Sequence, residues 1–159
     1  MRAAVITVSD RSARGERADA SGPVAVVALE DAGWEVQSVI VPDGVGSVAA
    51  AIRSALEAGA RLVVTCGGTG VAPHDLTPEG TAPLLVAELP GLAEEIRRRG
   101  AATLPMAVLS RGLAGIAESP NGRALVVNLP GSPGGVRDGM AVVLAVAKHV
   151  LDQLEGADH

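Results

Sequence analysis

The pattern of apolar and polar stretches along the chain predicts strands that alternate with helices. Unbroken apolar runs rich in β-branched residues are typical of strands buried on both faces, and two such runs stand out here. Near the other end, Asn121-Gly122 separates two further apolar runs and is a typical hairpin turn, so one strand is expected to run antiparallel to the rest. The predicted strands span residues 3–8, 34–41, 62–66, 113–117 and 123–129.

Apolar residues spaced three or four positions apart predict helices between these strands. Thr77 and Ser132 are the expected N-caps of two of them, since each hydroxyl residue is followed at once by a proline, and Ser21 can cap a third. Residues 103–111 are ambiguous, because Pro105 can begin a short helix there. The predicted helices span residues 21–33, 46–59, 78–88, 92–100 and 133–154.

Strands that alternate with helices favour a parallel sheet covered on both faces. The predicted fold is therefore an α/β three-layer sandwich, α/β/α, with a mostly parallel sheet and one antiparallel strand. We expect a single domain over residues 1–155 and a frayed tail over residues 156–159.

Composition narrows the class of protein further. Of 159 residues, 48% are hydrophobic, yet there is no Phe or Tyr and a single Trp, so the core must be built from Val, Leu, Ile and Ala. One cysteine excludes an internal disulfide and a Cys-rich zinc site, which is typical of a cytoplasmic protein. No stretch approaches the ~20 apolar residues of a membrane span, so no membrane association is expected.

The net charge of −5 makes binding to nucleic acid an unlikely main activity, because the phosphate backbone attracts basic surfaces. Trp34 is the only aromatic residue, so the stacking surface of single-strand binders is also missing. We therefore expect no nucleic-acid partner.

The stretch from residue 62 to residue 79 is the centre of the predicted chemistry. It begins as a buried strand, breaks into the loop Gly67-Gly68-Thr69-Gly70, and restarts as a helix. Successive glycines let main-chain N–H groups approach a phosphate, and a helix N-terminus adds favourable potential. The alternative is a tight structural turn, since neither G-x-G-x-x-G nor a P-loop is present.

Four side chains around this loop each have two interpretations. Asp75 can hold Mg²⁺ or add a cap to the following helix. His74 can donate to a phosphate or remain an ordinary solvated neighbour, and Asp43 is by itself a turn former. Cys66 ends a buried strand and is interpreted as a core residue rather than a nucleophile. A polar loop after the first strand carries Arg11, Arg14 and Arg17, which can meet phosphate or be balanced by nearby acids.

Four ordered segments resemble those of molybdopterin-binding proteins of molybdenum-cofactor biosynthesis. Residues 65–79 resemble the family motif T-T-G-G-T-G-x-x-x-R-D-x-T-P-E. The other segments are Ser9-Asp10-Arg11 with Asp19-x-Ser21-Gly22-Pro23, Leu109-Ser110-Arg111 with Gly115, and Asn128-Leu129-Pro130-Gly131-Ser132-Pro133. The resemblance spans nearly the whole chain and implies the same three-layer fold, as a homotrimer.

The activity implied by this resemblance is transfer of AMP from ATP to molybdopterin with Mg²⁺, which releases pyrophosphate. The adenylated pterin would then pass to the enzyme that inserts molybdate. Two acidic positions of active members fall on Asp43 and Asp75, which implies catalytic and metal-binding roles for both. The residues implied in binding nucleotide and pterin are Ser9, Asp10, Arg11, Gly67, Gly68, Thr69, Gly70, His74, Thr77, Pro130, Gly131, Ser132 and Pro133.

Two departures from the family motif keep other functions open. Cys66 replaces a Thr, which is a small change, whereas His74 replaces an Arg and so removes a permanent bidentate phosphate donor. The first alternative is a paralogue that binds molybdopterin without turnover, as a carrier or assembly protein. The second is a sensor domain for other phosphorylated ligands on the same fold.

Overall fold

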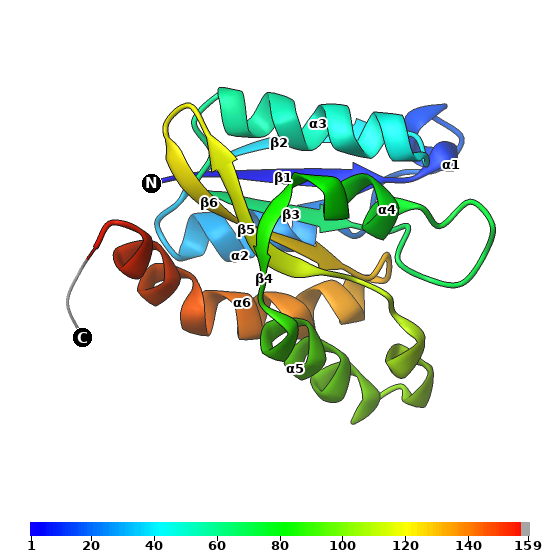
Figure 1. Ribbon diagram of the computed structural model, residues 1–159. Coiled ribbons are helices and arrows are strands. Elements are labelled where there is room, and N and C mark those ends of the chain that lie inside the picture. The colour runs from blue at the N-terminus through cyan, green and yellow to red at the C-terminus, as the bar shows by residue number, and fades with distance from the viewer. Residues whose placement is uncertain (157–159) are drawn as a thin grey trace.

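A six-stranded sheet runs through the middle of the computed structural model, which describes residues 1–156 (Figure 1). The strand order is β2-β1-β3-β6-β5-β4, and β5 is antiparallel to both of its neighbours while the other pairings are parallel. The strands are β1 (Arg2–Val8), β2 (Glu35–Val41), β3 (Leu62–Cys66), β4 (Leu85–Glu88), β5 (Ala114–Ser119) and β6 (Gly122–Leu129).

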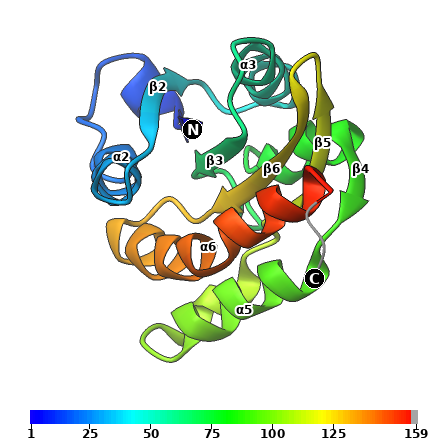
Figure 2. The ribbon, with the colours of Figure 1, turned by 90° about the vertical axis from the view of Figure 1, so that its left-hand side faces the viewer.

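Helices cover both faces of this sheet, as the end-on view shows (Figure 2). On one face lie α2, α5 and α6, and on the other lies α3 with the short α4 beside it. The helices are α1 (Asp10–Ala13), α2 (Gly22–Asp31), α3 (Val45–Glu57), α4 (Thr77–Thr81), α5 (Pro90–Ala101) and α6 (Pro133–Leu154), with 3₁₀ turns η1 (Ala82–Leu84) and η2 (Pro105–Leu109).

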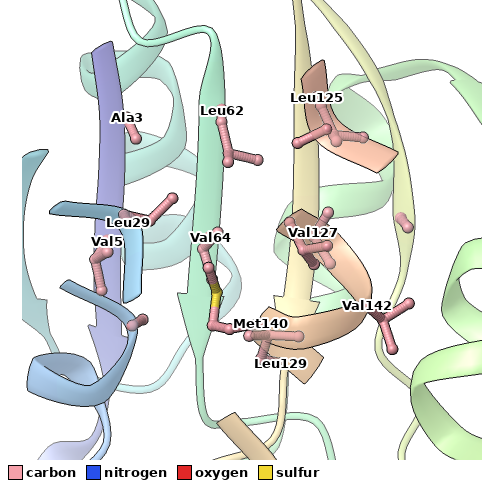
Figure 3. Packing of buried hydrophobic residues seen from close by; sticks show 14 of the residues in the cluster. Ala3, Val5, Leu29, Leu62, Val64, Leu125, Val127, Leu129, Met140 and Val142 are labelled. Atoms are coloured by element: carbon pink, nitrogen blue, oxygen red, sulfur yellow. The ribbon is translucent and has the colours of Figure 1, made fainter. Parts of the chain in front are cut away.

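The core consists of two apolar layers, one on each face of the sheet. Alternate residues of β1, β3 and β6 point to opposite faces, so strands buried on both sides need the unbroken apolar runs seen in the sequence. On the α6 face, Val64, Val127 and Leu129 pack against Met140 (Figure 3). On the α3 face, Ile6 and Val63 pack against Ile52.

The predicted α/β three-layer sandwich with one antiparallel strand is confirmed. The helix predicted over residues 78–88 is wrong, because α4 ends at Thr81 and β4 follows at Leu85. Pairing of β4 with β5 at the edge of the sheet decides the conformation of residues 85–88. The ambiguous stretch 103–111 contains the 3₁₀ turn η2, which begins at Pro105.

Of the three predicted helix caps, the structure confirms one and shows that the other two are wrong. Ser132 caps α6, since its Oγ accepts from the N–H of Gly135 at 3.1 Å. Thr77 is not a cap: it is the first residue of α4, fully buried, and its hydroxyl donates to the carbonyl of Gly67. Ser21 makes no capping bond through its side chain either, and Asp19 accepts from the N–H groups of Ser21 and Gly22 instead.

The hairpin between β5 and β6 is confirmed, although its turn lies one residue earlier than predicted. Ser119 pairs with Gly122, so the two loop residues are Pro120 and Asn121. Gly122 then takes a φ of 102°, a conformation that favours glycine.

Within residues 1–156, no helix is both long enough and apolar enough to cross a bilayer. The single domain over residues 1–155 stays a prediction. Of the tail predicted to fray, residues 157–159 lie outside the described part of the chain.

Candidate functional site

The candidate site lies where β1, β2, β3 and β6 end, because parallel strands place their carboxyl ends at one edge of the sheet. The long loop between β3 and α4 extends from this edge on the right of Figure 1, on the same side as α1. Gly67 follows β3 at a φ of 107°, and its N–H donates to the carbonyl of Leu129 at the end of β6. A Cβ on Gly67 would lie 2.4 Å from the carbonyl oxygen of Val8, so only glycine fits between the strand ends.

Two cavities open at this edge and share Gly68, Asp75 and Gly131. The first, of about 500 Å³, lies between the loops after β1, β2 and β3, and charged and polar side chains together line most of it. The second, of about 580 Å³, lies between the glycine loop, η2 and the start of α6, and its walls include Ile96, Leu104 and Met106. The first cavity therefore offers both carboxylates and arginines to a charged ligand, and the second offers more apolar walls.

Asp10 and Asp43, which both line the first cavity, form two hydrogen bonds with each other. The N–H of Asp10 donates to Oδ2 of Asp43, and the N–H of Asp43 donates to Oδ1 of Asp10, both at 3.0 Å. This reciprocal bonding ties the loop after β1 to the loop after β2. One oxygen of each carboxylate has no hydrogen-bond partner in these contacts.

Asp75 approaches the same glycine loop from the other side. Its Oδ2 accepts from the N–H of Ala72 at 3.1 Å, and its own N–H donates to the carbonyl of Ala72, which closes a tight turn. A Cβ on Gly70 would lie 2.6 Å from Oδ2, so a side chain at this position would displace the carboxylate. The interpretation of Asp75 as a helix cap is not supported, because its side chain bonds within the loop and not to α4.

Arg111 binds the outer side of this loop. Its Nε donates to the carbonyl of Gly70 at 2.8 Å, its Nη2 donates to the carbonyl of Asp75 at 2.6 Å, and its Nη1 pairs with Glu79. Its own N–H donates to the carbonyl of Thr69 at 2.7 Å. The hydrogen bond from Arg111 lowers the pKa of the Glu79 carboxyl, which stays charged.

A buried polar network supports the loop from beneath. The Nδ2 group of Asn128 in β6 donates to the hydroxyls of Thr65 and Thr81, both at 3.0 Å, and its Oδ1 accepts from the N–H of Leu113. Thr81 in turn donates to the carbonyl of Thr77, whose hydroxyl holds Gly67. Every buried side-chain N or O atom of the described residues has a partner, so the network is complete.

The basic side chains around the first cavity differ in whether an acidic partner already occupies them. Arg14 pairs with Glu16 at 2.8 Å, whereas Arg11 and Arg17 line the cavity without an ion pair among the described contacts. His74 is 67% exposed, and its Nε2 lies 3.9 Å from Oδ1 of Asp75. Arg11 is thus better placed than Arg14 to meet a phosphate.

Cys66 lies at the end of β3 under the first cavity and is fully buried. Burial raises the pKa of its thiol to about 12, with a smaller contribution from the charge of Asp19. A thiol in this state is not a nucleophile, which agrees with its interpretation as a core residue.

Comparison with known proteins decides the family. Residues 4–149 match the model of a family described as a probable molybdopterin binding domain. The chain belongs to this family. A molybdopterin adenylyltransferase from Pyrococcus furiosus is 39% identical over 148 residues, which cover 92% of this chain and 87% of that protein.

Two further relatives show the range of the molybdopterin binding domain. The crystal structure of a molybdopterin biosynthesis protein from Mycobacterium abscessus is 45% identical and has a TM-score of 0.89, with 98% of this chain and 96% of that chain covered. A molybdenum cofactor biosynthesis bifunctional protein from Synechococcus elongatus is 38% identical over 158 residues, and this chain spans 48% of its length.

Most residues that the resemblance implied lie around the two cavities of this molybdopterin binding domain. The first is lined by Ser9, Asp10, Arg11, Asp43, Gly67, Gly68, His74, Asp75 and Gly131, and the second by Gly68, Thr69, Gly70, Asp75, Pro130, Gly131 and Ser132. Thr77 and Pro133 line neither cavity. Thr77 holds the glycine loop from below, and Pro133 begins α6.

Three residues outside the predicted set prove important to the geometry of the site. Asp19 lines the first cavity, accepts from the hydroxyl of Thr7 at 2.6 Å and caps α2. Arg111 and Asn128 support the glycine loop. All three fall within the segments that resemble the family, which was the one signal that pointed to them.

Proposed function

We propose that this chain is a molybdopterin adenylyltransferase that acts in molybdenum cofactor biosynthesis. It would transfer AMP from ATP to the terminal phosphate of molybdopterin, so that a phosphate oxygen of molybdopterin bonds to the α-phosphorus and pyrophosphate leaves. Membership of the family and relatives of that name support the proposal. The single observation that carries it is that Asp43 and Asp75 line one cavity with the glycine loop between them.

The donor set fits Mg²⁺. Among the described residues no three His, Cys, Asp or Glu side chains gather, but Mg²⁺ in phosphate chemistry needs only one or two carboxylates and keeps water and phosphate oxygens as its other ligands. Asp43 and Asp75 each use one oxygen in a main-chain hydrogen bond, which orients the carboxylate, and no hydrogen bond among the described contacts uses the other oxygen. A bound Mg²⁺ would neutralise charge on the phosphates.

The glycine loop and the start of α6 would hold phosphate oxygens. Nucleotidyl transfer depends on positioning of the reactants and on neutralisation of the charge that develops on the phosphates, more than on covalent chemistry by the protein. Gly67 and Gly68 let the backbone approach a phosphate, and α6 offers the N-terminus of a 22-residue helix at Ser132. Arg11 and Arg17 line the first cavity without an ion pair among the described contacts, and we propose Arg11 for the phosphates of ATP.

The proposal is tested by incubating the protein with molybdopterin, Mg²⁺ and either ATP or GTP, and by measuring adenylylated pterin and pyrophosphate. Asp75→Asn should keep the fold and lose about a hundredfold or more in rate, since a neutral amide is a poor ligand for Mg²⁺. Asp31→Asn, an exposed position at the end of α2, is the matched control. Wild-type turnover in Asp75→Asn would remove Asp75 from the site.

One observation favours the alternative of a molybdopterin-binding paralogue without turnover. His74 stands where the family has Arg, and it is mostly exposed beside Asp75. In that case the same assay would show pterin binding and no pyrophosphate with either nucleotide. The sensor alternative instead requires binding of unrelated nucleotides with no response to molybdopterin.

We further propose a cytoplasmic homotrimer that delivers its product to the enzyme that inserts molybdate. The support for this is the family resemblance, together with large apolar side chains that the single chain leaves exposed around η2.

A further inference from the structure

Arg111 makes an unusual set of contacts for a half-exposed arginine. Two of its three guanidinium nitrogens bind main-chain carbonyls at the two ends of the segment 70–75, and Glu79 binds the third. We propose that Arg111 is a positioning residue, which holds this segment so that the carboxylate of Asp75 keeps its orientation in the site. This inference rests on the proposed function, in which Asp75 acts on the metal and phosphates.

The segment needs such support because little else fixes it. Residues 71–74 belong to no helix or strand, and Val71, Pro73 and His74 are exposed. The turn is closed by one main-chain bond, from the N–H of Asp75 to the carbonyl of Ala72, and by the carboxylate of Asp75 itself. A planar guanidinium that binds both ends of the segment restrains it in a way that a single contact cannot.

The contact leaves the chemistry of Asp75 untouched. Arg111 binds the main-chain carbonyl of Asp75 and pairs its charge with Glu79, so the Asp75 carboxylate is not engaged in an ion pair with it. Arg111 also lines neither of the two cavities. Its position therefore supports orientation of a reacting group and not direct contact with phosphate.

This arrangement predicts that lysine cannot replace Arg111, since an ammonium on a flexible stem cannot reach two carbonyls and a carboxylate in one plane. Arg111→Lys and Arg111→Ala should lower kcat about tenfold or more, because a shift of about 1 Å in a positioned group is enough for such a loss. The Mg²⁺ concentration for half-maximal rate should rise about fivefold. The KM for molybdopterin should change less than about twofold, since Arg111 lines neither cavity.

Two further variants separate this role from general stability. Arg98→Ala removes another exposed Arg–Glu pair, with Glu95, that makes no main-chain contact and lies on α5, and it should behave as wild type. Glu79→Gln leaves both carbonyl contacts of Arg111 and should lose less activity than Arg111→Lys. Circular dichroism shows whether each variant is folded.

The outcomes distinguish this inference from the proposed function. If wild type turns over and Arg111→Lys keeps its kcat and its Mg²⁺ requirement, the positioning role is wrong. A rise in KM for ATP with unchanged kcat would also overturn it, because it would mean direct binding. If wild type shows no turnover, the proposed function fails, and hydrogen exchange at the amides of Ala72 and Asp75 decides the inference: faster exchange in Arg111→Lys supports it, and unchanged exchange overturns it.

Discussion

Cys66 links burial, acidity and stability in one side chain. Because its pKa is raised from the ordinary value of 9.0 to about 12, the folded chain keeps the thiol proton at a pH where the unfolded chain loses it. The free energy of unfolding is therefore unaffected below pH about 9 and falls as the pH rises toward about 12, by at most about 1.4 kcal/mol per pH unit.

Chemical denaturation between pH 8 and pH 11 measures this fall. The chain is well suited to the experiment, since it has no Tyr and Lys148 is its one lysine. Cys66→Ala is the control, and its stability should vary much less over the same range. An equal slope in both proteins would contradict the assignment to the thiol.

Individual residues were predicted well where one local rule acts and poorly where the tertiary structure overrides it. Ser132 caps α6 as its sequence context indicates, because Pro133 and a long helix follow it. Thr77 has the same context, but its hydroxyl donates a hydrogen bond to the carbonyl of Gly67 and does not cap the helix. Nothing in the sequence next to Thr77 indicates that neighbour.

At the scale of elements, strands buried on both faces were the easiest to predict. Residues 3–8 and 62–66 are the two unbroken apolar runs and became β1 and β3, while residues 123–129, which follow the predicted hairpin turn, became β6. The edge strand β4 was missed, since its four residues are mostly exposed and follow directly on a helix and a 3₁₀ turn. Its partner β5 decides its conformation, and that contact is not local.

The hydrogen bonds of Asn128 join β6 to β3 and α4, so their loss should destabilise all three elements. Asn128→Ala leaves the N–H of Leu113 without its acceptor and the hydroxyls of Thr65 and Thr81 without their donor, in a buried region. Unpaired buried polar groups of this kind cost about 1–3 kcal/mol each, although relaxation reduces the sum. We expect a loss of about 2–4 kcal/mol in the free energy of unfolding.

Urea denaturation measures this loss, and Asn121→Ala is the control. Asn121 lies in the exposed hairpin turn between β5 and β6. A loss of less than about 0.5 kcal/mol for Asn128→Ala would show that water replaces the amide at no cost, and the network would then contribute little to stability.

For the whole molecule, the layered fold could be predicted from the order of helices and strands, but the contacts between loops at the site could not. The sequence places Asp43, the glycine loop and Ser132 at strand ends, and a parallel sheet then brings those ends to one edge. Which loop touches which depends on the strand order, in which β6 lies beside β3. Only the resemblance to a known family related these segments in advance.

Assembly also belongs to this scale. Leu104, Met106, Val108 and Leu109 expose 48–65% of their surface, an amount of apolar area that a second copy of the chain would cover favourably. Light scattering should give three times the mass of the 15.9 kDa chain. A mass equal to that of one chain at micromolar concentration would contradict the trimer.

The place of β6 in the sheet has a consequence for how the molecule folds. Leu62 pairs with Leu125, so the central contact of the sheet joins positions far apart in the chain and raises its contact order, which slows folding. During synthesis, the ribosome would make β1, β2 and β3, together with Asp43 and Asp75, well before β6 can pair with β3 beneath the site. A nascent chain would therefore complete its pterin-binding cavities only late in synthesis, and a bound pterin would report that the whole sheet is complete.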